Sequence, residues 1–574
     1  MNRLVLFSLL FFLPSVAFAQ AQPHIIMILG DDALRGHIAE YRTDSVDTAW
    51  TGAGDTATPN LDTIAQAGVM VDHLITSQVC SPSRATLLGY GYAHMPSNLM
   101  GGAHDMDVPI LHTWEVRPSF KTLVDYAHDL SYEVVFIGKS HLTRLSWREQ
   151  TEVEDDTPGT SDTSWVKAMG FDRATYMIGN TRHASYLGVL PIGSPTLTAD
   201  DVDCLGHNDF VVCDIDGLCS QQTALHSTVY FMNVLQDDLT NHTNTKTLYI
   251  FEPPAAHSPF EFGTANNCAT GTRTQDDRVS GSACGTTDCV YEEFITNLDT
   301  EIGAVMADMN AGTGFDIGGA GDLDTICFAW DNGVPIDATN PADCENSEGV
   351  KNTPFPCGTE GGLICGGSAV TATPGHITGL HSMADIPKTL EQMMGGTGKG
   401  QTEAGHSIMD CLDGTVSLAS CPSLDFVPYT EWSPVGSAKT KGTMPDRMPD
   451  CAVDAAADWT KLEVGGWTHG FSSRFLLHRI YAMDGTCNFT EALYDTNGTT
   501  DRYVSTASGL IADSSLIGPT QGAIDPDGVG VDWVSDPGLG NETNALAFLT
   551  YRTNLIVDNQ GKPPLQAAGV DGAF

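Results

Sequence analysis

Four short apolar runs in this sequence each lead into side chains that could carry chemistry. These side chains are, in chain order, Asp31 and Asp32, Lys139 and His141, His257, and Asp331 and Asn332. Carboxylates, an amide, an ammonium group and imidazoles are groups that bind ions or exchange protons and hydrogen bonds. One such ending would be unremarkable, but four of them indicate a single shared site.

Cys80 is set apart from the other cysteines of the chain. The sequence holds 15 cysteines, and the next one after Cys80 is Cys204. An odd number leaves one thiol over when the others pair. If Cys80 is chemically special, all the others can form disulfides, and the sequence leaves their pairing open.

The runs before these side chains have the length and character of buried parallel strands. They are His24–Leu29, Glu133–Ile137, Thr247–Phe251 and Thr325–Trp330, each bounded by turn residues and too short for an independent helix. Helices are expected between them, a short one over Pro59–Gly68 and a longer one over Tyr291–Met309. This alternation predicts an α/β layered fold, in which ligands bind beyond the carboxyl ends of the strands.

The first residues are typical of an export signal. Arg3 supplies a positive start, Leu4–Leu13 is almost entirely apolar, and Ala17–Ala19 has the small-residue pattern of a cleavage site. The sequence therefore predicts a signal peptide over residues 1–19 and a secreted or periplasmic protein. Neither this run nor any later one is long and apolar enough to be expected to span a membrane.

Composition favours two domains after the signal. A shift toward Pro, Ser and Thr over Pro422–Pro445 predicts a large domain over residues 20–430 and a smaller α+β domain over residues 431–574. Two stretches of the large domain, Leu142–His242 and Glu261–Cys289, are rich in Gly, Thr, Asp and Cys. They are expected to form disulfide-pinned surface loops over the site, where loops often determine substrate choice.

The net charge of the chain excludes some classes of binding partner. With 72 acidic against 27 basic residues, the net charge is −45. Such a field argues against nucleic acid and anionic membranes as partners. It would also repel an anionic substrate unless salt screens it, which makes a saline habitat one hypothesis. The alternative is that acidity only keeps an exported protein soluble.

The strongest motif is Cys80-Ser81-Pro82-Ser83-Arg84, which resembles the signature of the type I sulfatases, cysteine-x-proline-x-arginine. Further segments resemble other sulfatase motifs, in the order that the family has them and across most of the chain. They are Thr58-Pro59-Asn60-Leu61-Asp62, Gly138-Lys139-Ser140-His141-Leu142, Ala256-His257-Ser258-Pro259-Phe260, Asp331-Asn332-Gly333, Glu360-Gly361-Gly362 and Leu493-Tyr494-Asp495.

This resemblance implies a fold like that of the alkaline phosphatases, with a large mixed, mostly parallel sheet between helices, and a divalent cation in the site. The implied cation ligands are Asp31, Asp32, Asp331, Asn332 and the oxygen of a formylglycine (3-oxoalanine) at position 80. Hard oxygen ligands suit Ca²⁺, with Mg²⁺ as an alternative, and do not suit zinc. Taken singly, Asp31-Asp32 would be interpreted as a turn with capping carboxylates and Asp331-Asn332-Gly333 as an ordinary tight turn.

The resemblance also implies that Cys80 is oxidised to formylglycine by a maturation enzyme of the host. The hydrated aldehyde would attack sulfur with one hydroxyl, and its second hydroxyl would allow sulfate to be released, which a serine could not do. Arg84 would brace this residue, Lys139 would bind sulfate oxygens, and His141 would take a proton from the hydrate. His257 would protonate the leaving oxygen or bind sulfate.

The sequence departs from the sulfatase pattern at one place. Sulfatases usually carry a second lysine a few residues before Glu-Gly-Gly, whereas the six residues before Glu360 here contain none. Lys351 is the nearest lysine. Either it takes that role after a shift of the loop, or the role is missing, and the sequence leaves both open.

Two other functions compete with hydrolysis of sulfate esters. One is a phosphonate or phosphate ester hydrolase of the same superfamily. The other is an inactive, sulfatase-like extracellular binding protein, against which the complete set of expected site residues argues. For a sulfatase, the substrate would be an aryl sulfate, another small sulfate ester or a sulfated polysaccharide, and nothing in the sequence separates them.

Overall fold

The structure is a computed structural model of the chain. It describes residues 24–43, 57–89, 121–140, 142, 166–167, 169–177, 210–216, 219–222, 227–241, 246–257, 287–310, 324–334, 351, 356–398, 405–424, 426–434, 459–469, 474–481 and 489–495. The predicted signal peptide lies outside these residues. Within them, no helix combines the length and the apolar character needed to cross a membrane.

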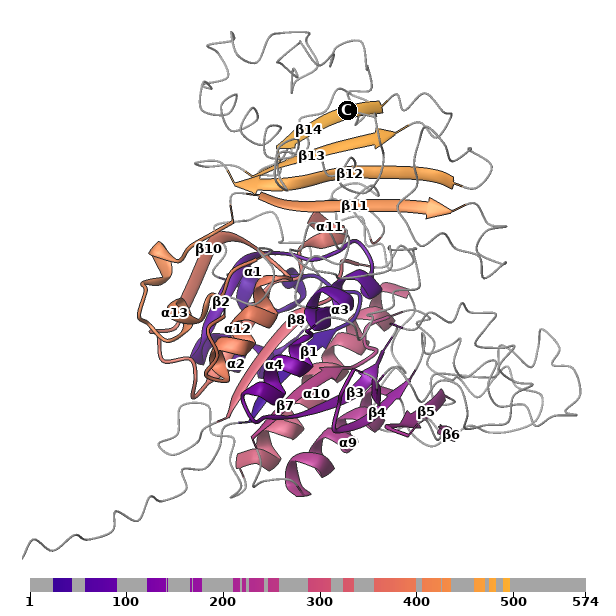
Figure 1. Ribbon diagram of the computed structural model, residues 1–574, viewed down its shortest axis with the longest axis vertical. Helices are drawn as coiled ribbons and strands as arrows, with labels where there is room; N and C mark the ends of the chain where they lie inside the picture. The colour runs from indigo at the N-terminus through magenta and orange to yellow at the C-terminus, as the bar shows by residue number, and fades with distance from the viewer. Residues whose placement is uncertain are drawn as a thin grey trace, which may run out of the picture.

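A sheet of ten strands forms the centre of the larger part of the molecule (Figure 1), in the order β10-β2-β9-β8-β1-β7-β3-β4-β5-β6. The strands are β1 (Ile25–Gly30), β2 (Val69–Ile75), β3 (Glu133–Lys139), β4 (Arg173–Met177), β5 (Phe210–Asp214), β6 (Cys219–Gln222), β7 (Thr247–Glu252), β8 (Thr325–Trp330), β9 (Leu363–Gly367) and β10 (Gly375–Ser382). β9 runs antiparallel to both its neighbours, and β5 and β6 add antiparallel pairs at one edge.

The four predicted strands are confirmed, and they are neighbours. They form β1, β3, β7 and β8, which lie in the order β8-β1-β7-β3 and pair in parallel. Every residue of β1, β7 and β8 is buried. Both faces of such a strand pack against other elements, so its side chains are apolar on both faces. In the sequence these segments are therefore unbroken apolar runs.

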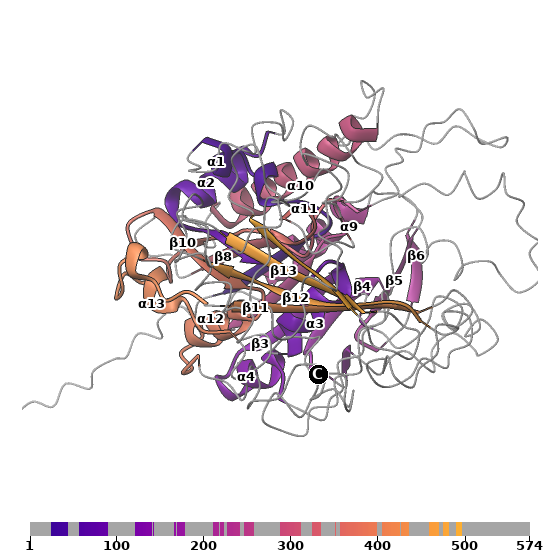
Figure 2. The same ribbon diagram turned by 90° about the horizontal axis from the view of Figure 1, so that it is seen from above.

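Helices cover both faces of this sheet. The helices of the described residues are α1 (Ala39–Thr43), α2 (Pro59–Ala67), α3 (Cys80–Gly89), α4 (Leu123–Asp129), α9 (Ser227–Asn241), α10 (Thr287–Asn310), α11 (Pro356–Thr359), α12 (Asp385–Met393) and α13 (Met409–Leu412), with short 3₁₀ turns at Arg35–His37 and Leu418–Ser420. Seen from above, α1, α2 and α10 lie on one side, and α3, α4 and α12 on the other (Figure 2). The helices predicted over Pro59–Gly68 and Tyr291–Met309 are α2 and α10.

Two hydrophobic clusters correspond to these two layers. Met27 of β1 points into the cluster that contains Leu87 of α3, while its neighbour Ile28 points into the cluster that contains Ile295 of α10. Successive strand side chains alternate between faces, so one strand serves both cores. The mixed, mostly parallel α/β fold expected from the sequence is thereby confirmed.

The expectation of surface loops over Leu142–His242 is wrong for part of that stretch. Residues in it form β4, β5 and β6, which extend the main sheet beyond β3, and α9, whose buried side chains include Phe231 and Leu235. The high content of Gly, Thr and Asp is typical of loops, so composition alone does not indicate these short elements. Most of the second predicted loop, Glu261–Cys289, lies outside the described residues.

The described residues after Phe426 form a separate antiparallel sheet of four strands. These are β11 (Phe426–Pro434), β12 (Trp459–His469), β13 (Arg474–Tyr481) and β14 (Phe489–Asp495), paired in chain order. The sheet lies beyond one end of the main domain, with β11 nearest to it (Figure 1). Its first strand begins close to the predicted boundary at residue 430, and the rest of the expected α+β domain lies outside the described residues.

Disulfides are present, and Cys80 is not in one. Cys327 of β8 is bonded to Cys365 of β9, and Cys411 to Cys421. Among the described residues, the thiol of Cys80 is free and buried. Cys80 is therefore available for chemistry of its own.

Gly138 allows β3 and β7 to approach closely at the end of both strands. Its φ is +117°, and a Cβ atom built there would lie 2.1 Å from the carbonyl oxygen of Glu252. We expect Gly138→Ala to lower the free energy of unfolding by about 3 kcal/mol, because backbone strain and a backbone clash act together. Denaturant unfolding measures this loss.

Gly395 supplies the matched control. Its φ is +97°, but nothing lies within 4 Å of the corresponding Cβ position. Gly395→Ala should therefore cost only backbone strain, about 1 kcal/mol. Equal losses for the two variants would contradict the close approach of β3 and β7.

Candidate active site

The carboxyl ends of the four central strands bring the predicted site residues together. Asp31 and Asp32 follow β1, Asp331 and Asn332 follow β8, Lys139 ends β3, and His257 follows β7. Parallel neighbours end at the same edge of a sheet, so residues far apart in sequence meet there. The backbone N–H of Asp32 donates to Oδ1 of Asp331 at 3.1 Å, which joins the β1 and β8 ends directly.

Cys80 is the first residue of α3, and this helix start faces the strand ends. The hydroxyl of Ser83 accepts a hydrogen bond from the backbone N–H of Ser77 at 2.9 Å, which fixes the turn before the helix. Pro82 lies in the first turn, where a missing N–H costs no helical hydrogen bond. The Sγ atom of Cys80 lies 3.2 Å from Oδ1 of Asp31 and 3.6 Å from Oδ1 of Asp32.

Two lysines flank the Cys80 thiol. Nζ of Lys139 is 3.6 Å from Sγ and 2.5 Å from Oδ2 of Asp31. Nζ of Lys351 is 3.1 Å from Sγ and 2.5 Å from Oδ1 of Asp32. The structure thus places Lys351 at the site, next to the residue around which the expected chemistry centres.

Arg84, one turn along α3, is fully buried beneath these groups. Its guanidinium donates to Oδ2 of Asp331 at 2.8 Å and to Oε2 of Glu252 at 2.6 Å, and lies 3.4 Å from Oδ2 of Asp31. It also donates to the backbone carbonyl of Lys139 at 2.8 Å. One side chain therefore contacts the ends of β1, β3, β7 and β8.

The backbone at Asp32 is held in an unusual conformation. Its φ is +58°, a left-handed value that a residue with a side chain adopts at a cost. The hydroxyl of Tyr291 on α10 donates to the Asp32 carbonyl at 2.8 Å, and the amide nitrogen of Asn332 donates to its Oδ1 at 2.7 Å. This geometry directs the carboxylate toward Cys80 and Lys351.

The residues at this site fit a divalent cation. Among the described residues, the buried Oδ2 of Asp32 and Oδ1 of Asn332 accept no hydrogen bond. Four carboxylates face three positive side chains, and burial raises the pKa of Glu252 and of Asp331 to about 7, so the site carries at most one excess negative charge; the groups are Asp31, Asp32, Glu252 and Asp331 against Arg84, Lys139 and Lys351. Ligand atoms of Asp31, Asp32, Cys80 and His257 lie within 4.8 Å of one another.

Burial shifts the ionisation of several groups in the site. It raises the pKa of the Cys80 thiol well above its ordinary value, and the Asp31 carboxylate adds to this shift. It lowers the pKa of His257 to about 3. Burial opposes the charge of Lys351, yet the Asp32 carboxylate raises its pKa above the ordinary value. At neutral pH the site therefore holds a protonated thiol, a neutral imidazole and an ammonium group.

Glu252 belongs to this site and was missed in the sequence. It is the last residue of β7, fully buried, and pairs with Arg84. Its position directly after the apolar run Thr247–Phe251 is the signal in the sequence that marks it. His141, which the sequence predicted as catalytic, lies outside the described residues.

A comparison with protein families gives one match. The family model described as Sulfatase matches residues 23–313, slightly more than half of the chain. These residues include β1, α3, β3 and β7, and with them Asp31, Asp32, Cys80 and Lys139. The comparison with curated proteins found no match.

Solved structures with a similar fold include sulfatase and phosphonate hydrolase structures. A Bacteroides thetaiotaomicron protein from work on the metabolism of multiple glycosaminoglycans is 16% identical, with 84% of this chain and 92% of that one covered and a TM-score of 0.57. The PsFucS1 sulfatase from Pseudoalteromonas sp. is 15% identical (83% and 84% covered, TM-score 0.50). The phosphonate monoester hydrolase SpPMH from Silicibacter pomeroyi is 13% identical (93% and 95%, TM-score 0.51).

Removing the charge of Glu252 tests the role of the buried ion pair. We expect Glu252→Gln to lower the free energy of unfolding by about 1–3 kcal/mol, the range for hydrogen bonds to charged groups, because Arg84 keeps its charge in a buried place. Denaturant unfolding measures the change.

The control for this variant is Glu133→Gln. Glu133 also pairs with an arginine, Arg173, at 2.5 Å, but its side chain is 38% exposed. Exposed pairs contribute about 0–1 kcal/mol, so this variant should be nearly neutral. An equal loss in the free energy of unfolding for Glu252→Gln and Glu133→Gln would show that burial of the Glu252–Arg84 pair does not add to its contribution to stability.

Proposed function

Because the chain belongs to the sulfatase family, whose members are sulfuric ester hydrolases, we propose that it hydrolyses sulfate esters at Cys80, which matures to a formylglycine. The single observation that carries this proposal is the free, buried thiol at the start of α3, held between two lysines and two aspartates. That thiol forms no disulfide, and the two lysine ammonium groups beside it can bind an oxyanion.

The exposure of the site residues suggests how a substrate would lie. The Lys139 side chain is completely buried, whereas Lys351 is 12% and His257 10% exposed. The sulfate group would therefore enter past Lys351 and His257 and reach Lys139 and position 80 at the bottom. Its leaving oxygen would then point outward, toward Lys351 and His257.

This orientation assigns a role to each polar side chain. Lys139 donates hydrogen bonds to the sulfate oxygens and offsets their charge in a place that water does not reach. Lys351 and His257 donate hydrogen bonds to the leaving oxygen. These hydrogen bonds stabilise the negative charge that develops on this oxygen as its bond to sulfur breaks. Lys351 would thus take the role of the lysine that is missing near Glu360, and Arg84 would position the strand ends without touching the substrate.

Asp31, Asp32, Asp331 and Asn332 would hold the divalent cation, which when bound supplies positive charge to the sulfate oxygens. Oxygen ligands favour Ca²⁺, and Mg²⁺ is the alternative. With the excess negative charge of the site neutralised in this way, an anionic ester can bind although the whole protein is strongly acidic.

The formylglycine supplies a hydrated aldehyde, which provides the nucleophilic hydroxyl and a second hydroxyl for release of sulfate. Its formation from Cys80 requires an oxidant and a maturation enzyme. Since Cys80 is 1% exposed in the folded chain, that enzyme would have to act before folding is complete. The predicted signal peptide further suggests that the mature protein works outside the cytoplasm, on a sulfated carbohydrate or an aryl sulfate.

Replacing Cys80 tests the proposal directly. Cys80→Ser should abolish hydrolysis of a chromogenic aryl sulfate, because a serine has no second hydroxyl with which to release sulfate. Its thermal unfolding should change little, since the thiol forms no disulfide. Mass spectrometry of the peptide that contains position 80 should find an aldehyde in active preparations. An active preparation whose Cys80 remains a thiol would overturn the mechanism.

The same assay separates the competing function. The phosphonate monoester hydrolase with a similar fold makes a phosphonate ester the relevant alternative substrate. Turnover of an aryl sulfate, an aryl phosphate and a phosphonate monoester should be compared at equal enzyme concentration. We expect the highest kcat/KM for the sulfate, and a preference for the phosphonate would assign the chain to the other activity.

Removal of the cation distinguishes metal binding from substrate binding. A chelator should abolish turnover, and added Ca²⁺ should restore it. Asp32→Asn should raise the Ca²⁺ concentration needed for this recovery, because a ligand has lost its charge. Lys351→Met should leave the Ca²⁺ requirement unchanged or lower it, since a positive charge is removed, but should reduce turnover about 100-fold or more. Full activity in chelator would contradict the cation site.

A further inference from the structure

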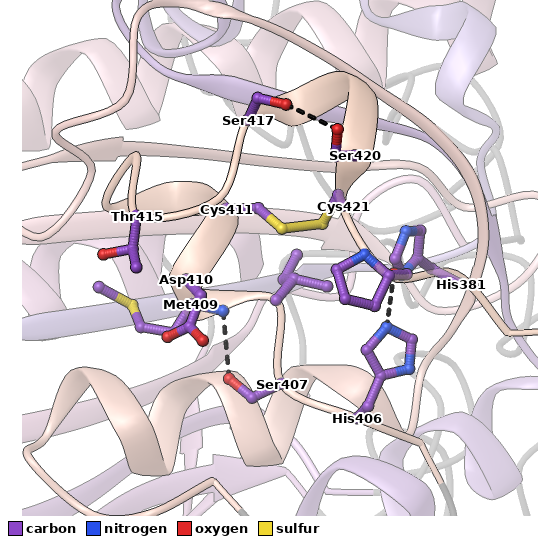
Figure 3. The surroundings of a disulfide bond; sticks show 12 residues. His381, His406, Ser407, Met409, Asp410, Cys411, Thr415, Ser417, Ser420 and Cys421 are labelled. Atoms are coloured by element: carbon purple, nitrogen blue, oxygen red, sulfur yellow. Dashed lines mark hydrogen bonds between the residues drawn. A yellow bond between two sulfur atoms is a disulfide. The ribbon is translucent and has the colours of Figure 1, made fainter.

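A second group of side chains that could hold a metal ion lies away from the candidate active site, where β10 meets the loop before α13. His381 is near the end of β10, Asp385 starts α12, and His406 precedes α13. Figure 3 shows both imidazoles close together beside the Cys411–Cys421 disulfide. We propose that His381, Asp385 and His406 form a structural zinc site that ties this loop to the main domain.

The carboxylate of Asp385 lies between the two imidazoles. Its Oδ2 is 3.1 Å from Nδ1 of His381, and its Oδ1 is 3.8 Å from Nδ1 of His406. One ligand atom from each of the three residues falls within 4.8 Å of the others. His381 and Asp385 are buried, and the side chain of His406 is 26% exposed.

The hydrogen bond made by Nε2 of His406 determines whether the other ring nitrogen, Nδ1, carries a hydrogen or a lone pair. Nε2 of His406 lies 2.7 Å from the backbone carbonyl oxygen of Pro422. A carbonyl only accepts, so Nε2 must carry the hydrogen, and in a neutral imidazole Nδ1 then holds a lone pair. That lone pair faces a carboxylate oxygen, which is unfavourable unless a positive charge lies between them.

The three residues are close enough to share one tetrahedral ion after a small adjustment of their side chains. Zinc bonds nitrogen and oxygen at about 2.0–2.2 Å, so adjacent ligand atoms around it are roughly 3.4 Å apart. In the structure the two imidazole nitrogens lie 3.1 and 3.8 Å from different oxygens of Asp385, and one ligand atom from each residue lies within 4.8 Å of the others, so the group would contract slightly around a bound ion. The exposed side of His406 leaves room for a water molecule as fourth ligand.

The ligand chemistry points to zinc and away from calcium. Two imidazole nitrogens and one carboxylate suit Zn²⁺ and similar transition ions, whereas calcium prefers six or more oxygens. The backbone carbonyl of Pro422 that accepts from His406 would act as an outer partner of a kind that metal-binding histidines usually have. This donor set differs from the oxygen-rich set around Cys80.

Several hydrogen bonds already hold the surroundings of the three ligands in place. The backbone N–H groups of Ser382 and His406 donate to the two oxygens of Asp385, at 3.1 and 2.8 Å. Nε2 of His381 has no hydrogen-bond partner among the described residues, whereas its Nδ1 lies within hydrogen-bond distance of Oδ2 of Asp385, so a zinc ion bound at Nδ1 would replace the proton there. A bound ion would add a link between β10, α12 and the loop that the disulfide closes.

A proton on Nδ1 of His406 would also satisfy the contact with Asp385, and the experiment must separate the two explanations. Full-length protein is stripped with a chelator and returned to saturating Ca²⁺, which fills the oxygen-rich site. Zinc chloride is then titrated by equilibrium dialysis with elemental analysis. We expect one zinc ion per chain and a rise in the thermal unfolding temperature on zinc binding.

The test variant is His406→Ala, and the matched control is His376→Ala. His376 is also on β10, also pairs with an aspartate (Asp72, at 2.7 Å), and is 19% exposed. His406→Ala should weaken zinc binding by more than about 100-fold, since even outer partners of a metal change affinity 10–100-fold. His376→Ala should leave it unchanged.

A third variant excludes binding at the other site. Asp32→Ala should keep this zinc ion, although it disrupts the oxygen-rich ligand set. Cobalt added in place of zinc should give visible absorption bands in the His376→Ala and Asp32→Ala proteins but not in His406→Ala. Absence of zinc binding by the unmodified protein, or its persistence in His406→Ala, would show that a proton and not a metal occupies the contact.

Discussion

The guanidinium of Arg84 is the contact on which the arrangement of the site depends. It binds carboxylates that follow or end three strands, Asp31, Glu252 and Asp331, and the carbonyl of Lys139 at the end of a fourth. A charge with no solvent exposure is tolerated only when it is paired and hydrogen-bonded. The four central strands must therefore end level with one another at the edge of the sheet, so that each can contact Arg84. This alignment of the strand ends also places Asp32 and Lys139 around Cys80.

Local charge, and not the charge of the whole chain, decides what can bind at this edge of the sheet. The chain carries a net charge of −45, yet its candidate site gathers Arg84, Lys139 and Lys351 within one buried cluster of carboxylates. With all four carboxylates ionised, one added divalent cation would turn a single excess negative charge into a single excess positive charge. A sulfate monoester carries a single negative charge, so its charge matches a site of this kind.

The two groups of potential metal ligands differ because their surroundings in the fold differ. At the strand ends, short acidic side chains converge around the start of α3 and offer oxygens to a hard cation. Near α12, a single aspartate lies between two imidazoles, one of which is oriented by a backbone carbonyl. The first set serves the proposed chemistry, and the second would stabilise a loop that a disulfide already closes.

The sequence by itself determined the central strands, the motif around Cys80 and most of the site, because buried parallel strands are unbroken apolar runs and the site residues follow them directly. Its patterns could not reveal β4–β6, whose short segments lack such runs, or the partnership of Glu252 with Arg84. Only the tertiary structure brought Lys351 to Cys80 and His406 to His381. These contacts join residues far apart in the chain, and the distance between them depends on how strands and loops pack, which no local pattern encodes.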